Sequence, residues 1–424
     1  MADLYVYFYA RALQLLRDGG TLCFISSNKF FRAGYGKGLR ETLADQTSMR
    51  AVIDFGDFPV FDAAAYPCVV ITDKGAPVAD HAYRGLTAEP DIELDKIGQT
   101  LDRDGQSLPQ AGGVQPPSGT AATSALVKRL MALGQPLGAF TGGRMYYGIK
   151  TGLNEAFVVD QATRDRLIAT DPRSAEVLKP FLRGRDVSRY RIISAGLWLI
   201  FTRRGVDISC YPAIEAHLQQ YRDDLEPRAN KDGDGPGRKP GQYKWYEIQD
   251  SVDYYAAFEG PKIVYPEFAP WPEFTFDPSG SYVGNKIYVL GVPVRWLVGI
   301  LNSGLTALVL ASLCSSVHGS TLEHRTIYVE RLPIVEPSEP DKRRLEALVD
   351  ELQALGGVGA RAAALEHEVD EIVYRTYGLT AEEVAEIERW HAERRERLGK
   401  GKGAEAASDA ARDENGADDE EAEQ

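Results

Sequence analysis

The sequence has few cysteines and no long apolar run. Its four cysteines form no Cys-x-x-Cys pair, and its six histidines do not cluster with them. We therefore expect free thiols in a reducing compartment and no metal site. No apolar run reaches the roughly 18 residues that span a bilayer, and the first residues lack the basic segment of a secretory signal. These absences predict a cytoplasmic protein without a membrane partner.

Basic residues are fewer than acidic ones, 48 against 62, and the acidic excess is unevenly distributed along the chain. The 424-residue chain has a formal net charge of −14, which is unusual for a protein that binds nucleic acid. Residues 335–424 hold 12 basic and 25 acidic residues, whereas residues 138–334 hold 23 basic and 22 acidic ones. Because nearly all of the excess acidity lies in the last fifth, local basic clusters in the middle stay compatible with a polyanionic partner.

The first 85 residues alternate between helical and strand patterns. The order is helix, strand, helix, strand, strand, which is typical of the closing half of an open α/β sheet. Apolar spacing and the bounding turns predict helices over 3–17 and 36–45, and strands over 21–26, 49–55 and 66–72.

The remaining residues divide into four segments. Residues 86–135 are rich in Gly, Pro, Asp, Ser and Gln, which predicts a connector with little core of its own. Short aromatic-rich segments between turns predict a globular α+β region over 136–337. A charged helical pattern covers 338–398, and we expect the acidic tail at 399–424 to be disordered.

Several segments, in order, resemble one family. FISSNKFF, GYGKGLRETL and VIDFGDFPVFDAAAYPCVVI resemble the later motifs of type IIG restriction–modification adenine-specific DNA methyltransferases. GIKTGLNEAFVVD, KPFLRGRDVSRYRI and KIVYPEFA resemble the TaqI-like C-terminal specificity domain of the same enzymes. The resemblance covers roughly residues 1–390. It implies that residues 1–85 are the C-terminal half of a Rossmann-like methyltransferase sheet, followed by a target-recognition domain. It also implies double-stranded DNA as partner, S-adenosyl-L-methionine as methyl donor and N6 of adenine as acceptor.

Two earlier motifs of that family are missing from this sequence. They are the FxGxG turn, which holds S-adenosylmethionine, and NPPY, which holds the adenine amino group. The pattern Gly34-Gly36-Gly38 is no substitute, because it follows an aromatic loop and not a strand. A half sheet without its central strands leaves an apolar edge and face uncovered. We therefore expect residues 1–85 to need a complement, either from a gene that starts further upstream or from a separate chain, and no methyl transfer by this chain alone.

The resemblance also assigns roles to single residues. Phe61 stands where relatives carry the ring that stacks on a flipped adenine, and the alternative is a loop ring packed on its own sheet. Tyr5 and Phe8 lie on the first helix, which in relatives borders the adenine of the cofactor, and the alternative is core packing. Asn28 and Lys29 follow a strand at the carboxyl edge of the sheet, where ligands bind. Substrate positioning and helix capping both stay open for them.

Basic residues gather at three places in the region 136–337. These are FLRGRDVSRYR, the Arg pair after LWLIFT, and the Gly/Pro-rich loop KDGDGPGRKPGQYK. Such clusters are often only a solvated face, but their mixture with aromatics on a neutral domain favours contact with DNA phosphates. The predicted DNA-binding set is Lys150, Arg183, Arg185, Arg189, Arg203, Arg204, Arg238, Lys239 and Lys244.

The sequence does not predict a nuclease site, because no strand-borne pair of carboxylates is followed by Glu-x-Lys. Two alternatives to a methyltransferase stay open. One is a non-catalytic specificity subunit that binds DNA and docks on a separate catalytic chain. The other is a remnant without activity.

Overall fold

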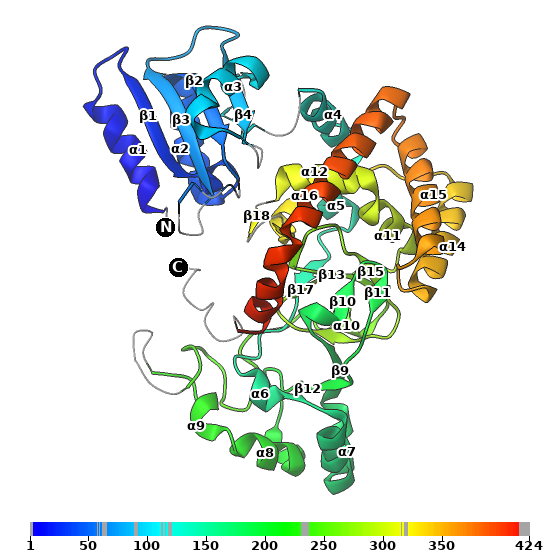
Figure 1. Cartoon of the computed structure of the whole chain (residues 1–424). Helices are drawn as coiled ribbons and strands as arrows, with labels where there is room; N and C mark the ends of the chain where they lie inside the picture. The colour runs from blue at the N-terminus through cyan, green and yellow to red at the C-terminus, as the bar shows by residue number, and fades with distance from the viewer. Residues whose placement is uncertain are drawn as a thin grey trace. The chain divides into compact units, whose positions relative to one another are not determined.

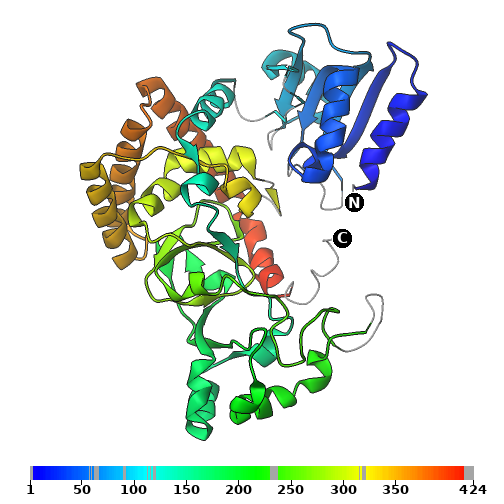
Figure 2. The same cartoon turned by 180° about the vertical axis from the view of Figure 1, so that it is seen from behind.

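The chain folds into two compact units in the computed structural model (Figures 1 and 2). Unit 1 comprises Met1–Ala132, Ala311–Glu323 and Leu379–Gln424, and unit 2 comprises Leu133–Leu310 and His324–Gly378. The structure describes residues 3–56, 58, 60–61, 66–88, 92–111, 113–114, 116–117, 121–229, 237–314, 316–317 and 321–414.

A five-stranded sheet forms the centre of unit 1, with the strand order β1-β3-β2-β4-β5. β3 runs antiparallel to both of its neighbours, β1 and β2. β4 is parallel to β2 and antiparallel to β5. The strands are β1 (Thr21–Ser27), β2 (Thr47–Asp54), β3 (Pro67–Lys74), β4 (Ala82–Thr87) and β5 (Gln106–Pro109).

Helices cover both faces of this sheet. α1 (Leu4–Leu15) and α2 (Lys37–Gln46) pack on one face, and α3 (Ile97–Asp104) packs on the other face over β2 and β4. The predicted helices and strands of the first 85 residues are therefore confirmed in type and order. A Cβ atom at Gly36 would lie 2.1 Å from the carbonyl oxygen of Phe30, so this glycine permits a close backbone approach before α2.

One side of unit 1 exposes apolar groups. Among the described residues β1 pairs only with β3, so its other edge is open. Leu22 of β1 is buried on the face that carries α1 and α2, whereas Cys23 and Ile25 are exposed on the opposite face. α1 adds a stripe of exposed apolar side chains, namely Leu4 (65% exposed), Tyr7 (55%), Phe8 (52%) and Leu15 (70%). Such an edge and stripe are typical of a surface that another segment covers.

Residues 86–135, predicted as a connector, contain regular structure instead. They hold α3, β5 and α4 (Ala121–Met131), and β5 completes one edge of the sheet. The buried side chain of Gln110 fixes this segment, because it accepts a hydrogen bond from the backbone of Met49 and donates one to the carbonyl of Leu43. The prediction is wrong because pairing with β4 stabilises a segment that has little local preference for a strand.

The C-terminal part of unit 1 is a long helix, α16 (Ala381–Glu414), which packs against α4. The guanidinium of Arg129 on α4 donates two 2.6 Å hydrogen bonds to the carboxylate of Glu383 on α16. We expected disorder from residue 399, but the helix continues to Glu414, and residues 415–424 lie outside the described residues. Unit 1 also holds the hairpin of β18 (Ser316–Val317) and β19 (Thr321–Glu323).

Unit 2 contains two four-stranded sheets. Their orders are β16-β9-β12-β8 and β15-β13-β17-β7, and their apolar side chains share one core. The strands are β7 (Met145–Tyr147), β8 (Val158–Val159), β9 (Leu178–Leu182), β12 (Leu197–Ile200), β13 (Lys262–Pro266), β15 (Thr275–Asp277), β16 (Tyr282–Val283) and β17 (Ile287–Leu290), and short pairs are formed by β10 (Val187–Ser188) with β11 (Arg191–Ile192) and β6 (Gln135–Pro136) with β20 (Pro333–Ile334).

The helices of unit 2 include α14 (Glu339–Ala354) and α15 (Ala360–Thr376), which lie side by side (Figure 1) within the segment predicted to be charged and helical. No single described helix is long and apolar enough to cross a bilayer, and only α11 with α12 (Gly304–Leu313), bent by 65°, passes that test as a pair. The helices are α5 (Leu137–Phe140), α6 (Asn154–Phe157), α7 (Gln161–Thr170), α8 (Pro212–Gln219), α9 (Arg222–Leu225), α10 (Ala256–Glu259), α11 (Arg295–Asn302), α13 (Thr326–Val329), α14 (Glu339–Ala354) and α15 (Ala360–Thr376).

Candidate functional site

A pocket opens in unit 1 at the carboxyl end of β1. Its walls come from β1, from the 3-10 helix η1 (Asn28–Phe31) and from the loop that joins β2 to β3. Its volume of about 290 Å³ is near the lower end of the range for small-molecule sites. The lining residues are Ile25, Ser26, Ser27, Lys29, Phe61, Tyr66 and Pro67.

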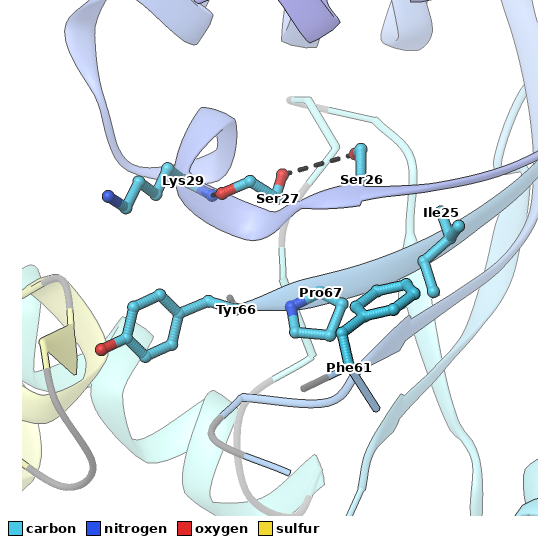
Figure 3. A pocket seen from close by; sticks show the side chains of 7 residues that line it. All are labelled: Ile25, Ser26, Ser27, Lys29, Phe61, Tyr66 and Pro67. Atoms are coloured by element: carbon cyan, nitrogen blue, oxygen red, sulfur yellow. Dashed lines mark hydrogen bonds between the residues drawn. The ribbon is translucent and has the colours of Figure 1, made fainter. Parts of the chain in front are cut away.

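Figure 3 shows how the side chains divide around this pocket. The ring of Phe61 lies beside Pro67 and Ile25, whereas Lys29 and Tyr66 point to the opposite side. Phe61 is 50% exposed, so half of its surface is free for a further contact. The pocket thus combines an aromatic ring with an amine and a phenol, which suits a flat, polar-edged molecule such as a nucleobase.

Two buried side chains join the end of β1 to the end of β2. The Asn28 amide donates a 2.8 Å hydrogen bond to the Asp54 carboxylate. Asn28 does not cap η1, because the Ser27 side chain accepts the hydrogen bond from the backbone N–H of Lys29. Asp54 and Tyr66 were not predicted from the sequence. The signal for them was a polar residue at each end of the segment that joins two apolar strands.

Of the two aromatic residues predicted to border the cofactor, Tyr5 packs within unit 1. Its hydroxyl lies 3.1 Å from that of Tyr35, and its ring meets Phe30 edge-on at 6.4 Å. Burial raises the pKa of Tyr5, and the hydrogen bond with Tyr35 raises it further, so the phenol stays neutral. Phe8 is 52% exposed and is the one of the two whose ring is open to a ligand.

In unit 2, exposed cations lie on segments that meet one another. The backbone N–H of Ile248 donates to the carbonyl of Thr202, and that of Asp250 donates to the carbonyl of Lys150. These bonds join the segment around residue 249 to the segments around residues 150 and 203. The loop 237–244 lies next to them, because Arg238 donates to the carbonyl of Thr151. Arg185 is exposed as well, on a different turn. We call the exposed cations of the joined segments the basic face, which consists of Lys150, Arg203, Lys239 and Lys244.

Arg238 was predicted to contact DNA, and the structure corrects this. Its side chain is 3% exposed, and its guanidinium donates to the carbonyl oxygens of Leu225 (2.8 Å), Thr151 (2.8 Å) and Trp245 (2.9 Å). Burial lowers the pKa of Arg238 to about 10, so it stays charged at neutral pH. Because it is buried, Arg238 does not reach a phosphate; it fixes the backbone beside Lys150 and along the basic loop.

Three other predicted arginines have partners within unit 2. The guanidinium of Arg204 donates to two backbone carbonyls of the segment 248–249. Arg183 lies 3.0 Å from the carboxylate of Asp186, and Arg189 lies 2.5 Å from that of Glu366. The three arginine side chains are 26–33% exposed, so a phosphate contact would compete with these partners.

A small recess of about 80 Å³ lies beside Arg203, which is one residue of the basic face. The guanidinium of Arg203 lies 4.7 Å above the ring of Tyr255 at its wall. Nearby, burial raises the pKa of Asp250, although the surrounding cations oppose that shift. The sequence analysis missed this acidic and aromatic lining, for which the segment QDSVDYY was the signal. The recess is lined by Arg203, Arg204, Val252, Asp253 and Tyr255.

Known protein families match two parts of the chain. Residues 1–61 match the family model of the Eco57I restriction-modification methylase, and residues 179–334 match that of the TaqI-like C-terminal specificity domain. The type II methyltransferase M.XhoI of Xanthomonas vasicola is 24% identical over 403 residues, which cover 90% of this chain and 69% of that relative. The type II methyltransferase M.PaeR7I of Pseudomonas aeruginosa is 25% identical, with 87% and 65% covered.

A solved structure shares the fold. The type IIL restriction-modification enzyme MmeI, in complex with DNA, aligns over 94% of this chain with a TM-score of 0.58 and 14% identity. The chain spans 65–69% of the two methyltransferases and 52% of the MmeI chain. These matches confirm the resemblance inferred from the sequence motifs. The chain is therefore similar over most of its length to type II methyltransferases of restriction–modification systems, and residues 179–334 match the TaqI-like C-terminal specificity domain.

Proposed function

We propose that this chain is the sequence-reading part and one wall of the active site of a DNA methyltransferase that modifies N6 of adenine. The observation that carries the proposal is the half-exposed ring of Phe61 in a pocket at the carboxyl end of β1. In this class of fold, ligands bind at the carboxyl ends of strands. The family match supplies the reaction class, and the pocket supplies a place for one base.

In this proposal the target adenine leaves the DNA stack and enters the pocket. Unstacking costs a few kcal/mol, and stacking on the ring of Phe61 recovers part of that cost. Lys29 and Tyr66 lie on the opposite side of the pocket, where an ammonium and a hydroxyl suit the polar edge or the phosphate of the flipped nucleotide. Unit 2 holds the flanking duplex, because its basic face presents four exposed cations.

S-adenosylmethionine would supply the methyl group, but the described residues do not fit it by themselves. Among the residues that the structure describes, the lining of the pocket includes no carboxylate that could bind the ribose hydroxyls of the donor. The exposed ring of Phe8 offers at most one apolar wall. The described residues by themselves therefore do not make up a donor pocket.

A second candidate function is a specificity subunit that docks on a separate catalytic chain. The open edge of β1 and the exposed stripe on α1 favour it, because a strand edge with an apolar flank is a template for pairing. The added strand would extend the sheet beyond β1. Exposed Ile25 and the stripe of α1 would be buried in that interface.

The proposal is tested by selecting DNA with the purified full chain. A pool of random-sequence duplexes is bound at low salt, washed at increasing salt, and the retained DNA is sequenced. We expect enrichment of one sequence that contains an adenine. Phe61→Ala should select the same sequence, because Phe61 lies outside unit 2. Retention without any sequence preference would contradict a sequence-reading role.

Methyl transfer separates the two candidate functions. The selected duplex is incubated with S-adenosylmethionine and the chain, with and without cell extract that holds its natural partners, and the bases are analysed by mass spectrometry. We expect N6-methyladenine only where a complement is present. Robust transfer by the chain alone would contradict the specificity-subunit candidate and would mean that the chain forms the donor pocket by itself.

A further inference from the structure

The loop between β2 and β3 carries Phe61. Asn28 is hydrogen-bonded to a residue at each end of that loop. The Asn28 side chain donates a 2.8 Å hydrogen bond to the carboxylate of Asp54, the last residue of β2. Its backbone N–H donates a 2.8 Å hydrogen bond to the carbonyl of Tyr66, the residue before β3. One residue of η1 thus holds the point where the loop leaves the sheet and the point where it returns.

Two further hydrogen bonds complete this base of the loop. The carboxylate of Asp54 also accepts the N–H of Gly56 at 3.0 Å, which fixes the turn out of β2. Gly56 has a φ of +50°, a backbone conformation that favours glycine. The N–H of Phe55 donates a 3.0 Å hydrogen bond to the carbonyl of Pro67. The loop therefore starts from a defined geometry on both sides.

Asn28 and Asp54 form a polar pair at buried positions, where apolar side chains are more common. Asn28 is 7% exposed and Asp54 is 5% exposed. A buried carboxylate is costly unless donors surround it, and Asp54 has two donors here, from Asn28 and Gly56. Unlike apolar packing, these bonds are directional, so they specify an angle as well as a contact.

We propose that Asn28 and Asp54 are positioning residues, which hold the two described ends of the loop and so direct the ring of Phe61 to the base pocket. This inference rests on the proposed function of Phe61 as the stacking ring. The pair does not touch the base, since neither residue lines the pocket. It acts through the loop, and losing the pair moves the ring while the sheet stays folded.

The test measures stacking directly, with 2-aminopurine deoxyribonucleoside monophosphate as the probe. Its fluorescence falls when it stacks on an aromatic ring, so titration with the full chain reports occupancy of the pocket. We expect saturable quenching by the natural chain and its loss in Phe61→Ala. Asn28→Asp should weaken binding about tenfold or more, because two carboxylates then face each other.

The double variant is the decisive arm. Asn28→Asp combined with Asp54→Asn restores one amide–carboxylate bond with the roles exchanged, so quenching should return to near the natural level. Gln110→Glu is the matched control, since it also turns a buried amide into a carboxylate in this sheet, on the side of α2 and Met49. It should lower the melting temperature without changing the quenching curve.

The outcomes distinguish this inference from the proposed function. Absence of quenching in the natural chain, or quenching that survives Phe61→Ala, overturns the stacking role and the positioning role together. Loss in Phe61→Ala with no change in Asn28→Asp overturns the positioning role alone. If the double variant does not regain the quenching, the positioning role alone is overturned as well. If Asn28→Asp does not fold, Asn28→Ser removes the side-chain bond without adding charge and takes its place.

Discussion

Arg238 donates a 2.8 Å hydrogen bond to the carbonyl oxygen of Thr151, although 87 residues separate the two in the sequence. The same guanidinium also binds the carbonyls of Leu225 and Trp245. A single buried cation thus gathers three backbone segments next to the basic face. Arg238, which was predicted to contact DNA, instead holds backbone carbonyls inside unit 2. The cations near it, such as Lys150 and Lys239, are exposed on the surface.

Arg238→Ala should destabilise unit 2 by about 2–4 kcal/mol, because several buried carbonyl oxygens lose their donor at once. Urea unfolding of the full chain measures this change. Lys239→Ala, one residue further on and exposed, should stay within about 0.5 kcal/mol of the natural chain. Equal stability of Arg238→Ala and Lys239→Ala would show that the buried hydrogen bonds of Arg238 do not hold the loop.

The apolar stripe of α1 should make the isolated chain bind hydrophobic dyes or self-associate. Tyr7→Lys together with Leu15→Lys replaces two side chains that are 55% and 70% exposed, so dye fluorescence should fall while the fold is kept. Val358→Lys is the control, because Val358 is also exposed (62%) but lies between α14 and α15 of unit 2. If both sets of substitutions lower the dye signal equally, the stripe is not a distinct docking surface.

His217 should make unit 2 sensitive to acid. Burial lowers the pKa of its imidazole, although the hydrogen bond with the carbonyl of Ala156 opposes this shift. Because the unfolded chain then takes up the proton more readily, the stabilising contribution is complete above about pH 6.5 and is lost as the pH falls through the lower folded pKa. His217→Gln should flatten the fall of the free energy of unfolding that sets in below about pH 6.5.

The control for that prediction is His367→Gln, on the exposed side of α15, where the imidazole is 72% exposed. This substitution should leave the pH profile of the unfolding free energy as it is in the natural chain. A profile that His217→Gln also leaves unchanged would mean that the buried imidazole does not govern the acid response.

The sequence predicts the elements whose pattern is local. The helices and strands from α1 to β3 follow from apolar spacing and from the turns between them, and all five are present. β5 was missed because its four residues become a strand only by pairing with β4. Sequence patterns describe neighbours along the chain, whereas β5 depends on a neighbour in space.

In the candidate site, too, the residues with a local sequence pattern were predicted, and those that depend on neighbours in space were not. Phe61 and Lys29 were found from a motif and from their place after a strand, and both line the pocket. The bond between Asn28 and Asp54 spans 26 residues, and no sequence pattern announces it. Arg238 was predicted to contact DNA because it lies in a Gly/Pro-rich basic loop, yet its carbonyl partners come from segments that only the fold brings together.

The central claim is that unit 2 presents its basic face to duplex DNA. The most direct test is the affinity of the full chain for a fluorescent duplex, measured between 50 and 200 mM salt. Contacts with four phosphates predict a slope of about −3.6 in a plot of log affinity against log salt, or about a hundredfold weaker binding over this range. Replacing all four residues of the basic face with Ala should flatten the slope to near zero. The exposed Arg361→Ala on α15 should leave the slope unchanged. No attraction to duplex at 50 mM salt, or a slope that survives removal of the four cations, would contradict the account.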